Sequence, residues 1–278
     1  MSEVWRQQIE PEPMKIDFVG WLRVARRGLP LGLLVFGCLM LLLLVRLVER
    51  PLFGAGRPWT PYITQFVCRS AFFIIGMEFE KQGDPMRGAG AVVANHSSWL
   101  DIFALNASKR IYFVSKAEVA KWPGIGWLAR ATGTVFIKRD RREAASQIAV
   151  FKERLSAGHK LLFFPEGTST DGLLVLPFKP TLFAAFFDPA LADTLRLQAV
   201  TLNYVAPVGV DPRFYGWWGD MAFGPHLLST LASQKQGKVT VIYYPPVKLT
   251  DFADRKVLAK TLEEQVRAGL VHRGDEGL

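Results

Sequence analysis

The segment 95–101 (NHSSWLD) combines an imidazole and a carboxylate at a spacing that suits general-base chemistry. It follows the apolar run Val92–Ala94, so His96 is expected at the end of a strand. Ser98 predicts a helix N-cap, which places Asp101 in the first helical turn. From there the carboxylate can hold one imidazole nitrogen and leave the other free to take a proton. Ser98-x-x-Asp101 is also a capping box, so this segment alone leaves a structural role open.

A second segment brings cations to another expected strand end. The run Thr134–Ile137 is followed by Lys138 and Arg139. Arg139 could hold a phosphate or a carboxylate through two parallel hydrogen bonds. Because residues 140–142 are also charged, a solvated charge run is the competing interpretation.

In a third segment, the hydrophobic run Leu161–Phe164 leads into a Pro-Glu-Gly turn. Gly167 allows the backbone to approach a ligand closely. Glu166 is expected to stand at the strand end with few neighbours to satisfy its carboxyl group. Lys179 adds a cation that is expected on the same side of the site. An ordinary strand-to-loop transition is the alternative interpretation.

The elements that would position these residues begin near residue 80, where short apolar runs alternate with helix-like segments. Strands are expected at 91–94, 112–114, 134–137, 161–164, 197–205 and 239–244, and helices at 99–106, 124–130, 143–156, 182–187 and 255–268. This alternation predicts an α/β domain with a mixed, largely buried sheet flanked by helices. In such sheets, functional groups collect where strands end and helices begin. We therefore expect a membrane-associated helical region at 1–80 and the α/β domain at 81–278.

The N-terminal region contains the charge-free run Leu29–Val45. At about 1.5 Å per residue it just crosses a hydrocarbon core of about 30 Å, so a tilted, re-entrant or interfacial helix is also compatible. A buried core helix is disfavoured because the run is apolar on every face. A long amphipathic lead, without a small-residue cleavage site after the run, disfavours a signal peptide. Basic residues flank both ends, which fits a monotopic hairpin with Tyr62–Met77 as a second membrane-contacting helix.

The composition limits the kinds of partner. The 278 residues carry a formal net charge of +9, which attracts nucleic acid, anionic lipid headgroups or phosphorylated substrates. No basic recognition helix stands out, so a nucleic-acid partner is not expected. Cys38 and Cys68 suggest neither a disulfide nor a metal site, which favours a reducing, cytosol-facing protein.

The motifs are specific in combination. His-x4-Asp, Gly-x-x-Phe-Ile-x-Arg, Phe-Pro-Glu-Gly-Thr and Pro-Phe-Lys occur in this order, and residues 60–250 resemble the glycerolipid acyltransferase family. The best-known bacterial members of that family are the 1-acyl-glycerol-3-phosphate acyltransferases. The resemblance implies a membrane-bound enzyme that moves a fatty acyl group from acyl-CoA or acyl-ACP to the hydroxyl of a lyso-lipid, with no metal and no bound cofactor. It implies the bacterial inner membrane, with the site facing the cytoplasm.

The resemblance also implies roles for individual residues. His96 would be the general base, and Asp101 would orient it. The acceptor site would include Arg139, Glu166, Gly167, Thr168 and Lys179.

Two positions depart from the family pattern. Members that form phosphatidic acid usually have Arg after Phe-Pro-Glu-Gly-Thr, where this chain has Ser169, and the family's strand proline is best matched by Ala199. The segments 167–172, 175–178 and 217–227 resemble the subgroup that acylates lyso-ornithine lipid, whose headgroup has no phosphate. Lyso-ornithine lipid is therefore the favoured acceptor, with lysophosphatidic acid as the alternative.

Two other classes fit the sequence less well. A hydrolase could use Ser97 or Ser98 as a nucleophile, but the chain has no Gly-x-Ser-x-Gly elbow. A non-enzymatic membrane adaptor would also be basic and anchored, but it would not need His96, Asp101 and Glu166 at separate strand ends.

Overall fold

The structure is a computed structural model that describes residues 5–6, 9–11, 14–122, 124–137, 144–192 and 195–270. The strands are β1 (Glu78–Gln82), β2 (Gly90–Ala94), β3 (Tyr112–Lys116), β4 (Val135–Ile137), β5 (Lys160–Phe163), β6 (Arg196–Val205), β7 (Lys238–Tyr243) and β8 (Val247–Lys248). The α-helices are α1 (Phe18–Phe53), α2 (Thr60–Ile75), α3 (Leu100–Ser108), α4 (Ile125–Thr132), α5 (Ala144–Ser156), α6 (Pro189–Ala192), α7 (Phe223–Ala232) and α8 (Arg255–Ala268). Short 3₁₀ segments are η1 (Ala117–Lys121), η3 (Pro180–Phe187) and η4 (Leu249–Asp251).

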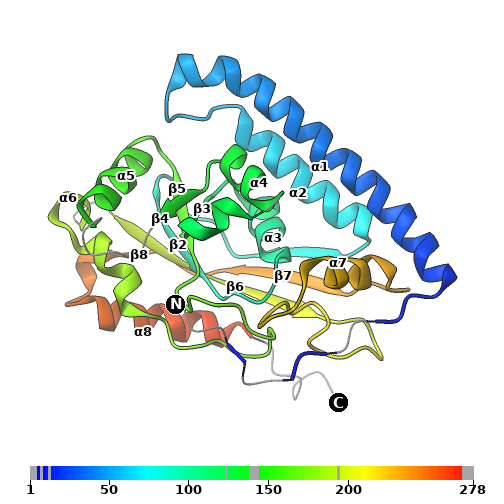
Figure 1. The fold of residues 1–278 in the computed structure, drawn as a ribbon. Coiled ribbons are helices and arrows are strands. Elements are labelled where there is room, and N and C mark those ends of the chain that lie inside the picture. The colour runs from blue at the N-terminus through cyan, green and yellow to red at the C-terminus, as the bar shows by residue number, and fades with distance from the viewer. Residues whose placement is uncertain are drawn as a thin grey trace.

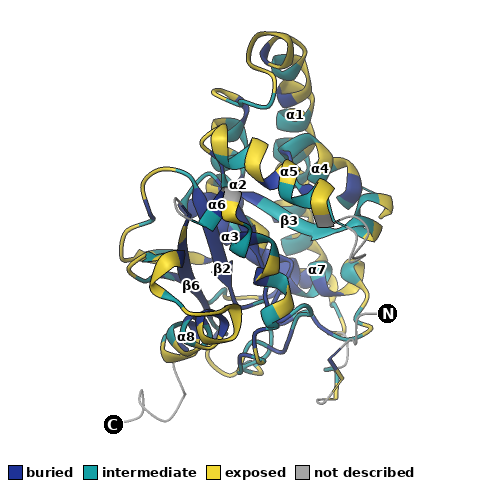
Figure 2. Cartoon of the chain, turned by 90° about the vertical axis from the view of Figure 1, so that its left-hand side faces the viewer, coloured by how far each residue is buried: buried dark blue, intermediate teal, exposed yellow. Residues whose placement is uncertain are grey.

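The strands form one eight-stranded sheet within the described residues. Its order is β1-β7-β6-β2-β5-β3-β4, and β8 pairs with the start of β6. Strands β6, β2, β5, β3 and β4 are parallel, whereas β7 runs antiparallel to β6. All residues of β2 are buried, because the strand is covered on both faces (Figure 2). The predicted mixed α/β sheet flanked by helices is confirmed.

Helices cover both faces of the sheet. Successive side chains of a strand point to opposite faces, so Val92 and Ala94 pack with α2, α3 and α7, whereas Ala91 and Val93 pack with α5, η3 and α8. The ribbon shows α8 on the opposite side of the sheet from α1, α2 and α3 (Figure 1). This three-layer arrangement holds the carboxyl ends of the parallel strands at one common edge.

The N-terminal helix α1 is longer than the charge-free run from which it was expected. Its 36 residues include Pro30 and Pro51. At about 1.5 Å per residue, this length exceeds a hydrocarbon core of about 30 Å. Only 11% of its most apolar 18-residue window is buried, so it is not a core helix. Its buried residues, Gly20, Arg27, Leu31, Leu42 and Glu49, recur at intervals of seven, four and eleven and form a single stripe.

The buried stripe of α1 is tied to the rest of the protein through polar groups. The Arg27 guanidinium donates to the carbonyls of Leu231 and Ser233 at 2.8 and 2.6 Å. The fully buried Glu49 carboxylate accepts from the N–H groups of Trp59 and Thr60 at 2.7 and 3.0 Å, and so caps the start of α2 from outside that helix. Residues on both sides of position 80 belong to one hydrophobic core.

The sequence did not predict strand β1, helix α7 or the short elements η1, α6, β8 and η4. Strand β1 is a polar edge strand, and helix α7 contains Pro225 in its first turn. The polar sequence of β1 therefore lacks the apolar run of a buried strand, and the Gly-Pro pair at the start of α7 is typical of a turn. The two cysteines are free, as expected.

Candidate active site

The site is built at the carboxyl ends of three neighbouring parallel strands, β6, β2 and β5. His96 follows the end of β2, and Glu166 follows the end of β5. Because Ala94, the last residue of β2, pairs with Val200, β6 continues past β2 and carries Tyr204 to the same edge. The fold thereby brings together residues that are distant in sequence.

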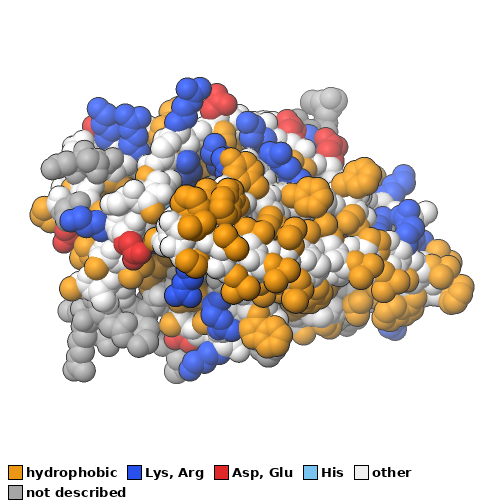
Figure 3. Space-filling view, turned by 90° about the horizontal axis from the view of Figure 1, so that it is seen from above, with side chains coloured by type: hydrophobic (Ala, Val, Ile, Leu, Met, Phe, Trp, Pro, Cys, Tyr) orange, Lys and Arg blue, Asp and Glu red, His pale blue; other side chains and the backbone are white. Residues whose placement is uncertain are grey.

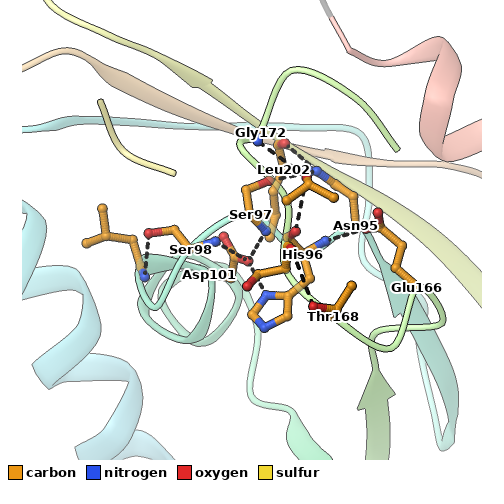
Figure 4. Close-up of polar contacts among 12 residues, drawn as sticks. Asn95, His96, Ser97, Ser98, Asp101, Glu166, Thr168, Gly172 and Leu202 are labelled. Atoms are coloured by element: carbon orange, nitrogen blue, oxygen red, sulfur yellow. Dashed lines mark hydrogen bonds and ion pairs between the residues drawn. The ribbon is translucent and has the colours of Figure 1, made fainter. Parts of the chain in front are cut away.

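Asp101 is the centre of this arrangement and is completely buried. Its Oδ2 accepts from Nδ1 of His96 at 2.7 Å and from the backbone N–H groups of Ser97 and Ser98 at 2.8 and 3.0 Å (Figure 4). Its Oδ1 accepts from the Tyr204 hydroxyl at 2.8 Å. The first turn of a helix also favours a negative charge at this position. The carboxylate therefore has a full set of donors.

The prediction that Ser98 is the N-cap of α3 was wrong by one residue. The N-cap is Trp99, whose side chain makes no capping hydrogen bond. The Ser98 hydroxyl instead accepts from Leu100 N–H at 3.3 Å. The Asp101 carboxylate accepts from the backbone N–H groups of Ser97 and Ser98, so it reaches back to the preceding loop, as expected.

His96 is oriented with one ring nitrogen available. Since Oδ2 of Asp101 already accepts two N–H groups, it acts as an acceptor for Nδ1–H, which leaves the lone pair on Nε2. The imidazole stacks on Phe164 with ring centroids 4.1 Å apart, and its side chain is 23% exposed. Within the described part of the chain, no group bonds Nε2. This geometry suits a base that takes a proton from an approaching hydroxyl group.

Two residues that hold this pair were not predicted from the sequence. Burial, and next the charge of Asp101, raise the pKa of Tyr204 well above its usual value, so the phenol stays protonated and donates. Asn95 continues the β2–β6 ladder through its side chain: Nδ2 donates to the carbonyl of Leu202 at 2.9 Å, and Oδ1 accepts from Leu202 N–H at 2.7 Å. Asn95 stood inside the motif and could have been noticed, whereas no local pattern marks Tyr204.

The expectation that Glu166 has few neighbours was wrong. Its carboxyl group is 1% exposed, and its two oxygens accept from the backbone N–H groups of His96 and Leu176, each at 2.7 Å. Burial raises the pKa of Glu166 to about 8, and the two N–H groups act in the opposite direction. Thr170 N–H donates to the His96 carbonyl at 2.9 Å. The loop after β5 therefore clamps the backbone of His96 from both sides.

The other predicted acceptor-site residues lie along this loop or outside the described residues. Gly167 has a φ of 79°, which a side chain would disfavour. The hydroxyl of Thr168 is 3.5 Å from the backbone nitrogen of Trp5. Lys179 is half-buried, and its N–H donates to the Pro165 carbonyl at 3.0 Å, so it lies beside the Glu166 turn. Arg139 lies outside the described residues.

Strand β4, which precedes Arg139, ends at Ile137 on the same edge of the sheet as His96. Strands β5 and β3 lie between β4 and β2. At about 4.8 Å between neighbouring strands, β4 stands roughly 14 Å from β2.

Aromatic residues pack around the segment 95–101 that carries His96 and Asp101. Trp217 N–H donates to the Ser97 carbonyl at 2.7 Å, and the indole N–H of Trp99 donates to Nδ1 of His226 at 2.9 Å. Burial lowers the pKa of His226 to about 4, so its ring is neutral and can accept this bond. The side chain of Trp5 is buried beside Trp218, with ring centroids 6.1 Å apart. Trp5 thus lies against the loop that holds His96.

A histidine and a buried aspartate, at the carboxyl edge of an α/β sheet, define a site that can deprotonate a hydroxyl group. The family model described as Acyltransferase matches residues 77–208. Lyso-ornithine lipid O-acyltransferase of Rhodobacter capsulatus is 54% identical over 97% of this chain and 98% of its own length. The chain therefore belongs to the acyltransferase family and is an acyltransferase, which confirms the resemblance.

Two further comparisons agree with this assignment. The 1-acyl-sn-glycerol-3-phosphate acyltransferase of Neisseria gonorrhoeae is 32% identical over 72% of this chain and 77% of its own length. The crystal structure of the 1-acyl-sn-glycerophosphate (LPA) acyltransferase PlsC from Thermotoga maritima has the same fold, with a TM-score of 0.63 at 19% identity over 93% of this chain and 98% of that chain.

Proposed function

We propose that this enzyme transfers a fatty acyl group from acyl-CoA or acyl-ACP to the free hydroxyl of lyso-ornithine lipid. The observation that carries the proposal is the geometry of His96: its Nδ1 bonds the buried Asp101 carboxylate, and its Nε2 is left available to a substrate. An alcohol becomes a competent nucleophile when a positioned base removes its proton during attack. His96 is the base, and Asp101 stabilises the imidazolium that forms.

The reaction proceeds by addition and elimination at the thioester carbonyl. The acceptor oxygen forms a bond to the carbonyl carbon while its proton moves to Nε2 of His96. Collapse of the tetrahedral intermediate breaks the carbon–sulfur bond, and the imidazolium returns the proton to the departing thiolate. The products are an ester and a free thiol, and no metal or redox partner is required.

A serine nucleophile fits the geometry poorly. Ser97 and Ser98 are both buried, with 1% and 0% exposure. Their hydroxyls accept from Asn95 and from Leu100 N–H, at 3.4 and 3.3 Å. A direct transfer to the acceptor therefore explains the site better than an acyl-serine intermediate.

The acceptor assignment rests on Ser169 and on the relative from Rhodobacter capsulatus, whose name gives lyso-ornithine lipid as its substrate. Binding a phosphate normally takes several charge-assisted hydrogen bonds, each worth about 1.5–3 kcal/mol. Loss of an Arg at position 169 therefore weakens phosphate binding. Arg139 and Lys179 remain available, so lysophosphatidic acid is the second candidate acceptor. The turn of Glu166, Gly167 and Thr168 shapes the acceptor site.

The outward face of α1 supports a membrane location. Leu29, Leu33, Phe36, Met40, Leu44 and Leu47 are each at least 59% exposed. Hydrophobic side chains form a continuous area on this side of the molecule, with Lys and Arg around it (Figure 3). Because α1 packs along α2 and α7, we place it in the interface of the bacterial inner membrane, with the active site on the cytoplasmic side.

The test is acylation by the purified full-length enzyme, with labelled acyl-CoA and acyl-ACP as donors. Lyso-ornithine lipid should be acylated at least as well as lysophosphatidic acid, and His96→Ala should lower the rate by about 10²–10⁴-fold. Ser169→Arg should raise activity on lysophosphatidic acid relative to lyso-ornithine lipid. Gln234→Arg adds the same charge at an exposed position and should leave the ratio unchanged. A strong wild-type preference for lysophosphatidic acid, unaltered by Ser169→Arg, would refute the acceptor assignment.

A further inference from the structure

A second hollow lies at the opposite edge of the sheet from His96. It occupies about 580 Å³, at the amino ends of β3 and β5 and beside the α1–α2 connection. Gly90 N–H, at the start of β2, donates to the His159 carbonyl, whereas His96 lies beyond the end of that strand. At about 3.3 Å per residue, the two places are roughly 20 Å apart. The hollow is therefore separate from the candidate active site.

The polar lining of this hollow is basic. It includes Arg57, Lys109, Arg110, Tyr112, His159 and Lys160, and none of its lining residues is acidic. Burial, and next the charges of Lys109 and Arg110, lower the pKa of Lys160. Among the described residues, no ion pair neutralises Lys109, Arg110 or Lys160. Like charges gathered in a partly desolvated place favour an anionic ligand.

His159 places unpaired polar atoms beside the hollow. Its side chain stacks on Tyr112, with ring centroids 4.0 Å apart, and the residue is 5% exposed. Neither ring nitrogen has a hydrogen-bond partner among the described residues. Nε of Arg57 is also buried without a partner, although another nitrogen of its guanidinium donates to the Ala131 carbonyl at 2.7 Å. Burial, and next the charges of nearby arginines, lower the pKa of His159 to about 3, so its ring is neutral and carries one N–H. Buried groups without a partner are rare, and a bound oxyanion would accept from this N–H and from Nε–H of Arg57.

The rim of the hollow is apolar and exposed. Phe53 and Tyr62 line it with 47% and 58% exposure, and the neighbouring Leu52 is 64% exposed. These residues continue the exposed apolar face of α1. A ligand that spans basic floor and apolar rim has an anionic head and a hydrocarbon tail.

We propose that the hollow binds the phosphate group of an anionic phospholipid whose acyl chains lie against the α1–α2 connection. The phosphate oxygens accept from Arg57, His159 and the three cations at 109, 110 and 160, of which Arg110 also stacks over the Tyr62 ring at 4.0 Å. The bound lipid fixes the α1–α2 corner on an anionic leaflet and takes no part in acyl transfer.

The experiment measures ligand binding to the full-length protein in a non-ionic detergent by titration calorimetry. The ligands are dihexanoyl-phosphatidylglycerol, dihexanoyl-phosphatidylcholine and inorganic phosphate. Phosphatidylglycerol should bind saturably and more tightly than the other two. Lys109→Gln/Arg110→Gln/Lys160→Gln should weaken its binding by about tenfold or more, since each cation contributes a charge-assisted hydrogen bond.

A matched control removes two lysines and one arginine elsewhere, as Lys235→Gln/Arg255→Gln/Lys256→Gln at exposed positions. This control should bind phosphatidylglycerol like the wild type. Equal weakening in both triple variants, or no weakening in the first, would overturn the proposal. Inorganic phosphate binding as tightly as phosphatidylglycerol would overturn its lipid part.

His159→Phe gives an independent test that keeps every surface charge. It should weaken phosphatidylglycerol binding while the melting temperature stays equal or rises, because the unpaired nitrogens are gone. Unchanged lipid binding in this variant would contradict the role of His159. The assay involves no acyl transfer, so its failure would leave the proposed function intact.

Discussion

Asp101→Asn tests whether the negative charge behind His96 drives the reaction. In the structure, Oδ2 of Asp101 accepts from two backbone N–H groups, so the amide oxygen of asparagine must take that position. The amide nitrogen then faces the Tyr204 hydroxyl, which can accept from it. The substitution therefore removes the charge while it keeps the shape and the contact with Nδ1 of His96.

The expected loss follows from the separation of the two charges. Nδ1 of His96 lies 2.7 Å from Oδ2, so the centres of imidazolium and carboxylate are about 4 Å apart. At an effective dielectric constant of about 20, a pair at that distance is worth about 4 kcal/mol. Because the imidazolium exists only after proton transfer, this energy is lost mainly from the transition state. The rate should fall by about three orders of magnitude.

The assay is single-turnover acyl transfer from labelled acyl-CoA, with thermal unfolding as the measure of folding. Tyr204→Phe is the matched control, because it removes one hydrogen bond to Oδ1 and leaves the charge. It should cost about tenfold in rate. A folded Asp101→Asn enzyme within tenfold of the wild-type rate would refute the electrostatic role, as would a larger loss in Tyr204→Phe.

Three further outcomes are expected. Asn95→Ala leaves the buried N–H and carbonyl of Leu202 unpaired. The free energy of unfolding, measured by chemical denaturation, should therefore fall by about 2–4 kcal/mol. A decrease below about 1 kcal/mol would contradict this. In the folded protein the pKa of His226 is about 4, whereas in the unfolded chain it is near 6.5, so the unfolded state binds this proton first as the pH falls. The free energy of unfolding should therefore fall by up to about 3 kcal/mol between pH 6.5 and pH 4. In His226→Gln the free energy of unfolding should depend less on pH. Removal of residues 1–50 takes away Arg27 and Glu49. The truncated protein should float less with lipid vesicles and should have a lower melting temperature. A truncated protein as stable as the full chain would show that the α1 contacts contribute nothing to stability.

The parts of the fold that could be predicted are those whose burial can be read from the apolar residues of one short segment of sequence. Strands β2 and β5 are apolar on both faces because both faces are covered, and their sequences show this directly. Strand β1 has a burial pattern typical of an edge, so its sequence EFEKQ resembles a loop. The extent of α1 was underestimated because the expected span was limited to the charge-free run Leu29–Val45, whereas the helix continues through the basic residues on both sides of that run.

The same distinction applies to the site. His96 and Asp101 are five residues apart, so a short loop and the first turn of α3 bring the carboxylate back to the imidazole. Tyr204 reaches Asp101 only because β6 pairs with β2 and extends beyond it, and a single sequence does not contain that register. Glu166 was placed at the correct strand end, but its partners are the backbone amides of His96 and of Leu176 in its own loop, and backbone amides carry no sequence signal.

The long-range bonds around His96 also set the order in which the protein can mature. The Asn95 and Leu202 groups that pair are 107 residues apart, and Glu166 lies 70 residues after His96. At roughly 5–20 residues per second, the ribosome needs about 5–20 s to make the chain between Asn95 and Leu202. Helix α1 is complete well before that time, so if α1 binds a membrane as proposed, it does so while His96 still lacks these contacts. Contacts of such high sequence separation form slowly, so the candidate active site is completed late, after α1 and the strands up to β6 have been made.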